Sequence, residues 1–483
     1  MYLFLLTVVS VASAQKIGDS SFFTTGDLRW IGSLPPDLVL DDEGSTVGQG
    51  AVLDQRIRLG GGYRNHGWRV GFEGDLLEGQ ALGGTWSLGP GDDRNRDTLG
   101  VVSGDSFSLR EASLSKRIGW MRASAGVMTS DWGLGMLANS GARDPLFGRS
   151  DFGDRVIRAS LTASPLEAPL YFTLAADRGI EDEIGAWADD QQVYQGIASV
   201  LYRAEDGPTA GVYAVYRDQL EADDIRRTQV GVMDVYASVP LALTDAGHGL
   251  TLSVEAAGFK GTTDRATTYN SPEQLAVLAG GVVAQAVASL PEERALLHLR
   301  GGWASGDGNP DDDQINDFAF DRDYDAGMVM FDEVGGALAA ANYQDLTDPT
   351  YSGTPPDGVD ALLTEGAVQK ATYGQLVGEV RPKPWLGVKL GGMVAWQTAP
   401  ISYAFETYRN GGVPTNQLGE ATSGTYLGSE LDWAVRLGGH DVDVASLATR
   451  PELLIQGGHL LASDALTGGV NQTLLMASGR VRW

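Results

Sequence analysis

Hydrophobic and polar residues alternate along most of the chain in segments of about ten residues. Clusters of Gly, Pro, Asn and Asp separate these segments, which is typical of β-strands joined by turns. The pattern predicts eighteen strands, an even number. The predicted strands cover residues 26–32, 50–62, 68–76, 106–116, 120–128, 154–163, 169–177, 192–203, 209–217, 227–238, 250–260, 275–290, 295–304, 367–381, 386–397, 425–437, 452–461 and 471–483.

The alternation also assigns the two faces of each strand, because successive side chains in a strand point to opposite sides. In the segment ELDWAVRL, Leu431 and Trp433 share one face, whereas Glu430 and Asp432 share the other. The last segment, 471–483, places apolar residues at every second position with arginines between them. A terminal strand of this kind that ends on an aromatic residue resembles the closing strand of bacterial outer-membrane β-barrels.

Short and long connections alternate between the predicted strands. Tight turns such as Asn65-His66-Gly67 and Pro382-Lys383-Pro384 alternate with long polar stretches at 77–105, 129–153, 178–191, 218–226, 305–366 and 398–424. Tight turns at one end and long loops at the other are typical of outer-membrane barrels. The predicted fold class is therefore all-β: a transmembrane antiparallel up-and-down β-barrel of about 18 strands, with short periplasmic turns and long acidic extracellular loops. A soluble β-sandwich stays open as an alternative.

The first residues of the chain have the features of a signal peptide. An apolar core is followed by Ala12-Ser13-Ala14, the small-x-small pattern that precedes cleavage, although the usual basic residues ahead of the core are missing. We predict a signal peptide at 1–14 and an outer-membrane β-barrel at 15–483. A buried strand is the alternative for the first segment.

The longest connection, 305–366, is expected to be an extracellular or lumen-folding loop. Within it, Met328, Phe331 and Val334 recur at helical spacing, which predicts a short helix in 326–342. A strand pair extending above the membrane is the alternative for this segment.

Composition agrees with a barrel and excludes several kinds of chemistry. Hydrophobic residues make up 43% of the 483 residues, and no window after the first dozen approaches the roughly 18 consecutive apolar residues of a transmembrane helix. A membrane barrel has no such window, because its lipid-facing and lumen-facing residues are interleaved. The chain has no cysteine. Zinc–cysteine sites, haem–thiolate sites and thiol nucleophiles are therefore excluded.

The net charge of −28 argues against nucleic acid as a partner of the whole molecule. Most of the acidic surplus falls in the loops, whereas arginine predominates among the charged residues on the non-apolar strand faces. In a barrel of this size, such charges are expected to line water and to create a field that passing solutes must cross. Bracing of loops and pairing with neighbouring carboxylates are the alternative role for any one of them. The predicted pore-lining residues are Arg56, Arg58, Arg69, Glu73, Asp75, Arg122, Arg158, Arg300, Arg381, Lys389, Glu430, Asp432, Arg436, Arg480 and Arg482.

An acidic run in the longest loop resembles a calcium-binding loop only in part. Residues 307–313 have the alternate oxygen spacing of an EF-hand, but Asp312 stands where glycine is needed and Phe318 where the bidentate glutamate is needed. We therefore expect no cofactor. An irregular calcium site at 307–313 stays open against a solvated acidic loop.

Motifs of known enzymes are missing from the sequence. None of the five histidines falls in a recognisable Ser-His or Asp-His arrangement, and there is no GxSxG, HExxH or P-loop. We therefore expect that the chain is not an enzyme.

Three stretches carry a resemblance to a known family. Residues 304–321 are similar to a Gly-Asp-rich segment followed by a Phe-Asp pair, 426–437 to a Gly-x-Glu-Leu-Asp strand, and 129–141 to a Trp-Gly loop of related barrels. By these stretches the chain resembles the alginate-export-type outer-membrane porins and related barrels. The resemblance implies eighteen strands and an arginine-rich constriction that conducts an anionic polysaccharide outward.

The function expected from these features is a passive channel in the outer membrane of a Gram-negative bacterium. It would pass ions and small or anionic hydrophilic solutes, with polysaccharide export as a narrower version. Expected partners are outer-membrane lipid, the barrel-assembly machinery and the solute, but no nucleic acid. Two alternatives stay open: a structural or adhesion barrel whose 305–366 loop plugs the lumen, and a barrel enzyme.

Overall fold

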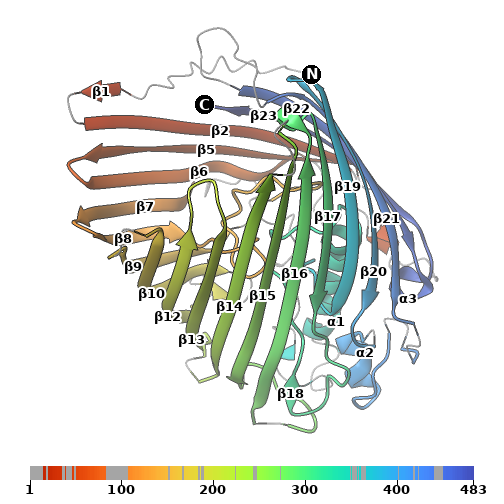
Figure 1. Cartoon of the computed structure of the whole chain (residues 1–483). Coiled ribbons are helices and arrows are strands. Elements are labelled where there is room, and N and C mark those ends of the chain that lie inside the picture. Colours follow the sequence, from red (N-terminus) through yellow and green to blue (C-terminus); the bar gives the residue numbers. More distant parts are fainter. Residues whose placement is uncertain are drawn as a thin grey trace.

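The strands of the computed structural model form a closed barrel (Figure 1). The structure describes residues 15–17, 20–34, 38–39, 46–47, 51–82, 107–150, 153–165, 168–182, 185–186, 190–223, 225–242, 247–271, 273–348, 350, 356, 358–359, 366–400, 402–416, 419–421, 424–439 and 450–483. The predicted signal peptide, 1–14, lies outside the described residues. Part of the predicted long stretches, including 83–105, lies outside them as well.

Within the described residues, eighteen antiparallel strands make up the barrel wall. They are β2 (Ser20–Leu34), β5 (Val52–Asn65), β6 (Trp68–Leu82), β7 (Phe107–Ile118), β8 (Met121–Thr129), β9 (Arg155–Ala163), β10 (Leu170–Asp182), β12 (Gln192–Arg203), β13 (Thr209–Leu220), β14 (Arg227–Ala242), β15 (Gly249–Thr263), β16 (Leu275–Ser289), β17 (Ala295–Ala304), β19 (Ala371–Lys383), β20 (Leu386–Gln397), β21 (Tyr426–Gly438), β22 (Arg450–Ala462) and β23 (Gln472–Arg482). Each predicted segment overlaps one of these strands. The predicted up-and-down barrel is therefore confirmed.

Shorter elements precede the first wall strand or lie in the connections. They are β1 (Gln15–Ile17), β3 (Leu38–Val39), β4 (Thr46–Val47), β11 (Gly185–Ala186), β18 (Gln314–Ile315), the 3₁₀-helix η3 (Pro291–Glu293), the π-helix η4 (Met330–Gly335), and the α-helices α1 (Gly336–Thr347), α2 (Ala404–Arg409) and α3 (Asp464–Thr467). The helix predicted in 326–342 is present, as η4 continued by α1. In the part of the chain that the structure describes, no helix is long and apolar enough to cross a membrane.

The first and last wall strands close the barrel by pairing with each other. β2 and β23 are antiparallel, in register from Asp27 opposite Arg482 to Leu34 opposite Leu475. The ladder continues at the end of the chain, where Gly26 and Trp483 exchange two backbone hydrogen bonds. Closure of this kind leaves no open sheet edge between the two strands.

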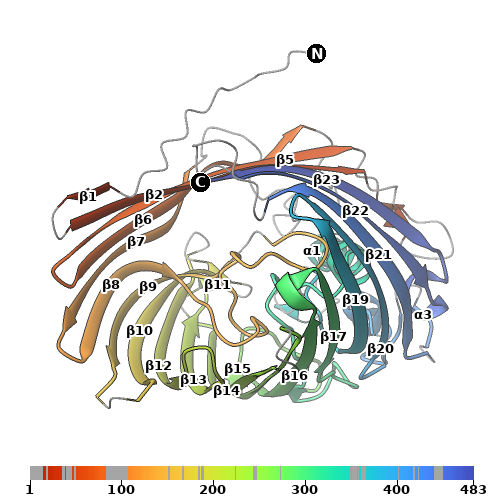
Figure 2. The same cartoon turned by 45° about the horizontal axis from the view of Figure 1, so that its top comes forward.

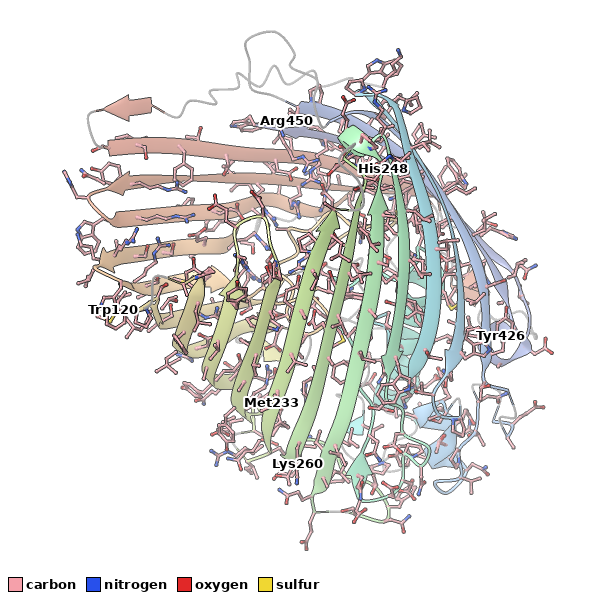
Figure 3. The ribbon with its side chains drawn as sticks, in the orientation of Figure 1. Trp120, Met233, His248, Lys260, Tyr426 and Arg450 are labelled. Carbon is pink, nitrogen blue, oxygen red and sulfur yellow. The ribbon has the colours of Figure 1, made fainter. Side chains whose placement is uncertain are left out.

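The predicted long connections all leave from one rim of the barrel. β15 begins just after His248 at the rim of short turns and ends beyond Lys260 at the opposite rim (Figure 3). Because the strands run alternately up and down, the connection after every second strand reaches this opposite rim.

Strand faces follow the predicted register. On β21, the Leu431 side chain points outward and is 54% exposed, whereas Glu430 is 3% and Asp432 1% exposed. Trp433 is outward and exposed as well. The same alternation recurs on β6, where Trp68, Val70 and Phe72 are exposed. The outer surface of the barrel is therefore apolar, and its charged residues face inward.

Long connections fold into the barrel and pack against its inner wall (Figure 2). We call residues 130–150, between β8 and β9, the inner loop, and residues 316–347, which include η4 and α1, the inner segment. Their apolar residues form one buried cluster with inward-facing wall residues, among them Met136, Phe147, Phe318, Phe320, Met328, Met330, Val377, Met393 and Leu460. The core of the protein therefore lies inside the barrel, where burial of apolar surface holds the connections in place.

A charged cavity inside the barrel

A cavity of about 340 Å³ lies between the inner loop and the wall formed by β2, β5, β6 and β19 to β23. Its walls carry nine basic and five acidic side chains. The basic ones are Arg29, Arg56, Arg58, Arg143, Arg149, Lys389, Arg436, Arg480 and Arg482, and the acidic ones are Asp27, Glu73, Asp144, Glu379 and Glu452. The lining residues of β20 to β23 lie near the rim of short turns. We call this space the charged cavity.

Two arginines of β5 are held by carboxylates of neighbouring strands. Arg58 makes a bidentate pair with the fully buried Asp75, from Nε to Oδ1 at 2.6 Å and from Nη2 to Oδ2 at 2.7 Å. Arg56 Nη2 lies 3.6 Å from Asp27 Oδ2. Bidentate pairing sets the orientation of a guanidinium precisely. These charges therefore have defined positions along the cavity wall.

A second group of charges surrounds Glu379 on β19. Arg381 Nε donates to Glu379 Oε1 at 2.7 Å, and Arg436 Nη2 lies 3.5 Å from the same oxygen. Lys389 Nζ lies 4.0 Å from Glu379 Oε2 and donates to the carbonyl oxygen of Leu146 at 3.1 Å. Glu379 is thus the shared ion-pair partner of three cations, so positive charge is in excess around it.

Contacts on both sides of its tip attach the inner loop to the wall. Gly148 exchanges two hydrogen bonds with the Gln456 side chain, and Phe147 is buried at 1% exposure. Arg149 pairs with Asp54 on β5. On the other side of the tip, Arg110 Nη2 donates to the carbonyl oxygen of Ser140 at 2.6 Å. The inner loop is therefore attached to the wall at several points.

A larger cavity, of about 800 Å³, lies on the side of the inner loop that faces the long connections. Arg217 and Asp182 line this cavity and pair with each other at 2.6 Å. Arg217 also donates to Gln219, which in turn donates to Glu221. Apolar residues of the inner segment, such as Phe331, line its other side. The two cavities share no lining residue, although the inner loop contributes to both. The inner loop therefore stands between them.

The structure brings about half of the predicted pore-lining residues together. Those lining the charged cavity are Arg56, Arg58, Glu73, Lys389, Arg436, Arg480 and Arg482, and Asp75 is buried behind Arg58. Arg381 joins this group through Glu379 and also pairs with Glu293. The others lie elsewhere.

Arg69 and Arg122 line neither cavity; both are exposed and lie near the rim of short turns. Arg158 makes a bidentate pair with Asp177 and also reaches Ser130 Oγ at 2.9 Å. Arg300 donates to the carbonyl oxygen of Asp325 at 2.6 Å and lies over the ring of Tyr324. These last two arginines hold the inner loop and the inner segment.

Glu430 does not line an open pore, because its side chain is covered by the inner segment. Its carboxylate accepts hydrogen bonds from the backbone N–H groups of Met328, Val329 (2.8 Å) and Met330 (2.7 Å). Asp432, two residues further along β21, is equally buried. Three amides at the start of η4 are thus held by one wall carboxylate, which fastens the inner segment to β21.

Several lining residues were not among the predicted ones. Asp27 and Arg29 alternate on β2, so the period-two pattern that identified Arg56 and Arg58 could have identified them. Arg143, Asp144 and Arg149 belong to the inner loop. No strand pattern applies to these three, because a loop reaches the cavity only through contacts distant in sequence.

Carboxylates of the acidic run at 307–313 accept hydrogen bonds from backbone N–H groups of the same connection and of a neighbouring one. Asp307 accepts hydrogen bonds from the N–H groups of Asn309 and Asn316, and Asp311 accepts from that of Tyr269. Among the described residues, no group of three or more His, Cys, Asp or Glu side chains is arranged to hold a metal ion.

Comparisons with known proteins show the fold of the chain. No protein-family model matches it, and no curated protein matches its sequence. Among solved structures, it is similar to the outer-membrane protein OprD from Pseudomonas aeruginosa (14% identity, TM-score 0.52, covering 98% of this chain and 96% of that one). It is also similar to OccAB1 of Acinetobacter baumannii (12%, TM-score 0.53, 98% and 99%) and to OccK11 of Pseudomonas aeruginosa (11%, TM-score 0.52, 96% and 96%).

These similarities cover nearly the whole chain, and the fold is that of OprD and the Occ proteins. They show the barrel fold of the chain. They do not support the alginate-export type in particular, which the resemblance in sequence had suggested.

Proposed function

We propose that this protein is a passive outer-membrane channel for small anionic hydrophilic solutes. Short turns would face the periplasm and long connections the exterior, as is usual for such barrels. The observation that carries the proposal is the charged cavity, with its surplus of four basic side chains in a protein whose net charge is −28. A basic lining on the inner wall of an acidic protein points to anions as the permeating species.

The electrostatics favour the cavity over the acidic loops as the selectivity filter. Exposed charges are screened beyond a Debye length of about 8 Å at physiological salt. Charges in a narrow, partly buried space act through a lower effective dielectric constant and are screened less. A guanidinium group carries five N–H donors in a planar fork, a geometry that matches the carboxylate of a passing solute.

The solute is expected to be small, because the inner loop and the inner segment occupy much of the lumen. Export of an anionic polysaccharide, which the resemblance in sequence implies, is a narrower version of the same proposal. Efflux of alginate oligomers from loaded proteoliposomes would test that version, whereas uptake of acetate and other small anions tests the general one.

The direct test is conductance in planar lipid bilayers. The purified protein should give stepwise conductance, and the reversal potential in a potassium chloride gradient should show a preference for chloride at high salt. The variant Lys389→Gln/Arg436→Gln, which removes two charges from the charged cavity, should shift the reversal potential towards cations at low and high salt.

Arg69→Gln/Arg122→Gln is the matched control, because it removes the same charge from exposed positions outside both cavities. Its shift should be smaller and should disappear at high salt. A barrel that migrates normally on a gel but never conducts would rule out the channel. Equal shifts in the two variants at high salt would rule out the charged cavity as the filter.

One observation favours a second function, a barrel closed by its own connections. The buried apolar cluster that joins the inner loop and the inner segment to the wall resembles a core more than a pore lining. A structural or adhesion barrel of this kind would stay silent in bilayers over the whole voltage range. The same recordings therefore distinguish the two functions.

A further inference from the structure

Asp144 of the inner loop contacts two arginines of the last strand, β23. Its Oδ1 accepts a hydrogen bond from Arg480 Nη1 at 2.6 Å, and its Oδ2 accepts one from Arg482 Nη1 at 3.2 Å. The Asp144 side chain is 56% exposed, whereas that of Arg480 is only 15% exposed. One carboxylate thus bridges two arginines at the surface of the charged cavity.

The backbone on both sides of Asp144 is fixed by packing and by hydrogen bonds, whereas its half-exposed side chain is held by its two contacts with Arg480 and Arg482. Towards the C-terminus, Phe147 is buried and Gly148 is bonded to Gln456, and on the other side Ser140 is bonded to Arg110. Pro145 restricts the backbone of the residue before it to extended conformations. The Asp144 carboxylate can therefore leave the two arginines by rotation about its side-chain bonds alone.

Electrostatics keep this carboxylate charged. Burial by itself raises the pKa of Asp144, but the positive charges of Arg480 and Arg482 outweigh this effect and hold the pKa below its usual value. Lys389 adds a third positive charge nearby. Asp144 is therefore an anion at neutral pH.

We propose that Asp144 is an internal counter-ligand: a tethered carboxylate that occupies Arg480 and Arg482 until the carboxylate of a passing solute replaces it. This inference rests on the proposed channel function. It names carboxylates as the class of solute that replaces Asp144 at the two arginines. A tethered group acts at an effective concentration in the millimolar range. Asp144 thus weakens net binding of the solute and speeds its release, which conduction requires.

The exchange needs no other group and no change in bonding beyond hydrogen bonds. Arg480 also pairs with Asp27, and Arg482 with Glu452 at 3.5 Å, so neither arginine is left without an anion while Asp144 moves away. The incoming carboxylate takes the two Nη1 donors that Asp144 gives up. Acetate, which has the same carboxymethyl group as the Asp side chain, is the simplest probe for this position.

The test measures single-channel conductance as a function of potassium acetate concentration. In Asp144→Asn, the tethered competitor is gone, so conductance should reach half-saturation at a several-fold lower acetate concentration than in the wild type. Asp144→Glu keeps the carboxylate, so its half-saturating acetate concentration should stay close to that of the wild type. Asp223→Asn removes the same charge from an exposed loop pair with Arg226 and should leave the half-saturation unchanged.

A second variant separates direct replacement from a general change in the field. In an Arg482→Gln background, one of the two arginines is already lost, so Asp144→Asn should lower the half-saturation concentration much less than it does alone. Equal effects with and without Arg482 would overturn the proposal, as would identical half-saturation in the wild type and Asp144→Asn. A wild type that does not conduct would instead refute the channel itself.

Discussion

Arg480 on the last wall strand donates from Nε to both carboxylate oxygens of Asp27 on the first, at 3.0 and 2.9 Å. The two residues lie on β23 and β2, whose pairing closes the barrel. Arg56 adds a third charge at 3.6 Å from Asp27. The closing seam is therefore held by a network of ion pairs in addition to its backbone ladder.

Asp27→Asn should destabilise the barrel, because it leaves Arg480 and Arg56 without their shared anion. Removal of one partner from a buried pair costs about 3 kcal/mol, and this part-buried pair should cost less than that. We expect a lower midpoint for the loss of heat-modifiable migration on a gel. Asp218→Asn, in the more exposed pair Asp218–Arg227, is the control and should cost about 1 kcal/mol or less. Equal midpoints for Asp27→Asn and the wild type would contradict the role of the seam network.

Deletion of residues 481–483 should prevent closure. It removes the pairings of Val481 and Arg482 with β2 and the two hydrogen bonds between Gly26 and Trp483. An open edge is then exposed, so heat-modifiable migration should be lost. Deletion of residues 15–17 is a matched control of equal length, because β1 pairs only with the start of β2 outside the closing seam. Normal assembly of the first deletion would disprove its role in closure.

The wall of the barrel could be predicted from sequence because its signal is local. Alternation within a segment such as ELDWAVRL assigns Leu431 to the outside and Glu430 to the inside without any knowledge of the neighbours. The same pattern predicts that Arg56, Arg58, Arg436 and Arg480 face inward. A strand has only two faces, so a correct period determines which residues share the interior.

The contents of the lumen could not be predicted in the same way. Whether an inward charge meets solute or protein depends on connections that come from distant parts of the chain. Glu430 holds amides about a hundred residues away, at Met328 to Met330, and Arg300 holds the carbonyl oxygen of Asp325. Asp144 reaches Arg480 across more than three hundred residues. None of these contacts leaves a periodic signal in the sequence.

Leu431→Arg should destabilise the barrel by about 2–4 kcal/mol if the residue lies near the membrane midplane, because the charge would face hydrocarbon. Leu431→Phe keeps the outer face apolar and is the control. Reversible unfolding in lipid vesicles measures the difference. If Leu431→Arg were as stable as the wild type, this face of β21 would not contact lipid.

Glu430→Gln tests the attachment of the inner segment. The amide side chain has only one oxygen, so it cannot accept all three N–H groups of Met328, Val329 and Met330 that the carboxylate holds. The barrel should still assemble, but the start of η4 should loosen, with larger current fluctuations in bilayers. The variant Glu420→Gln, in an exposed connection, is the control. Unchanged current noise in Glu430→Gln would show that the segment is held by its apolar contacts alone.

Asp325 of the inner segment should make the stability of the folded barrel depend on pH, and the sign of this dependence can be predicted. Burial raises its pKa well above the usual value, the charges of Asp332 and Glu430 raise it further, and Arg300 opposes them only in part. The folded state therefore binds this proton more tightly than the unfolded state does. Stability should fall as the pH rises above about 3.9, the value of an unperturbed Asp, and should level off above the raised pKa.

Asp325→Asn cannot lose a proton and should remove this dependence. Its unfolding midpoint should equal that of the wild type near pH 4 and exceed it increasingly towards neutral pH. Asp223→Asn provides a control of opposite sign, because hydrogen bonds from the N–H groups of Arg226 and Ile225 lower the pKa of Asp223 to about 2. That variant should be slightly less stable than the wild type at neutral pH, and the difference should disappear as the pH falls towards 2. A constant offset between Asp325→Asn and the wild type at every pH would mean that Asp325 has the same pKa in the folded and unfolded states, which would contradict the prediction.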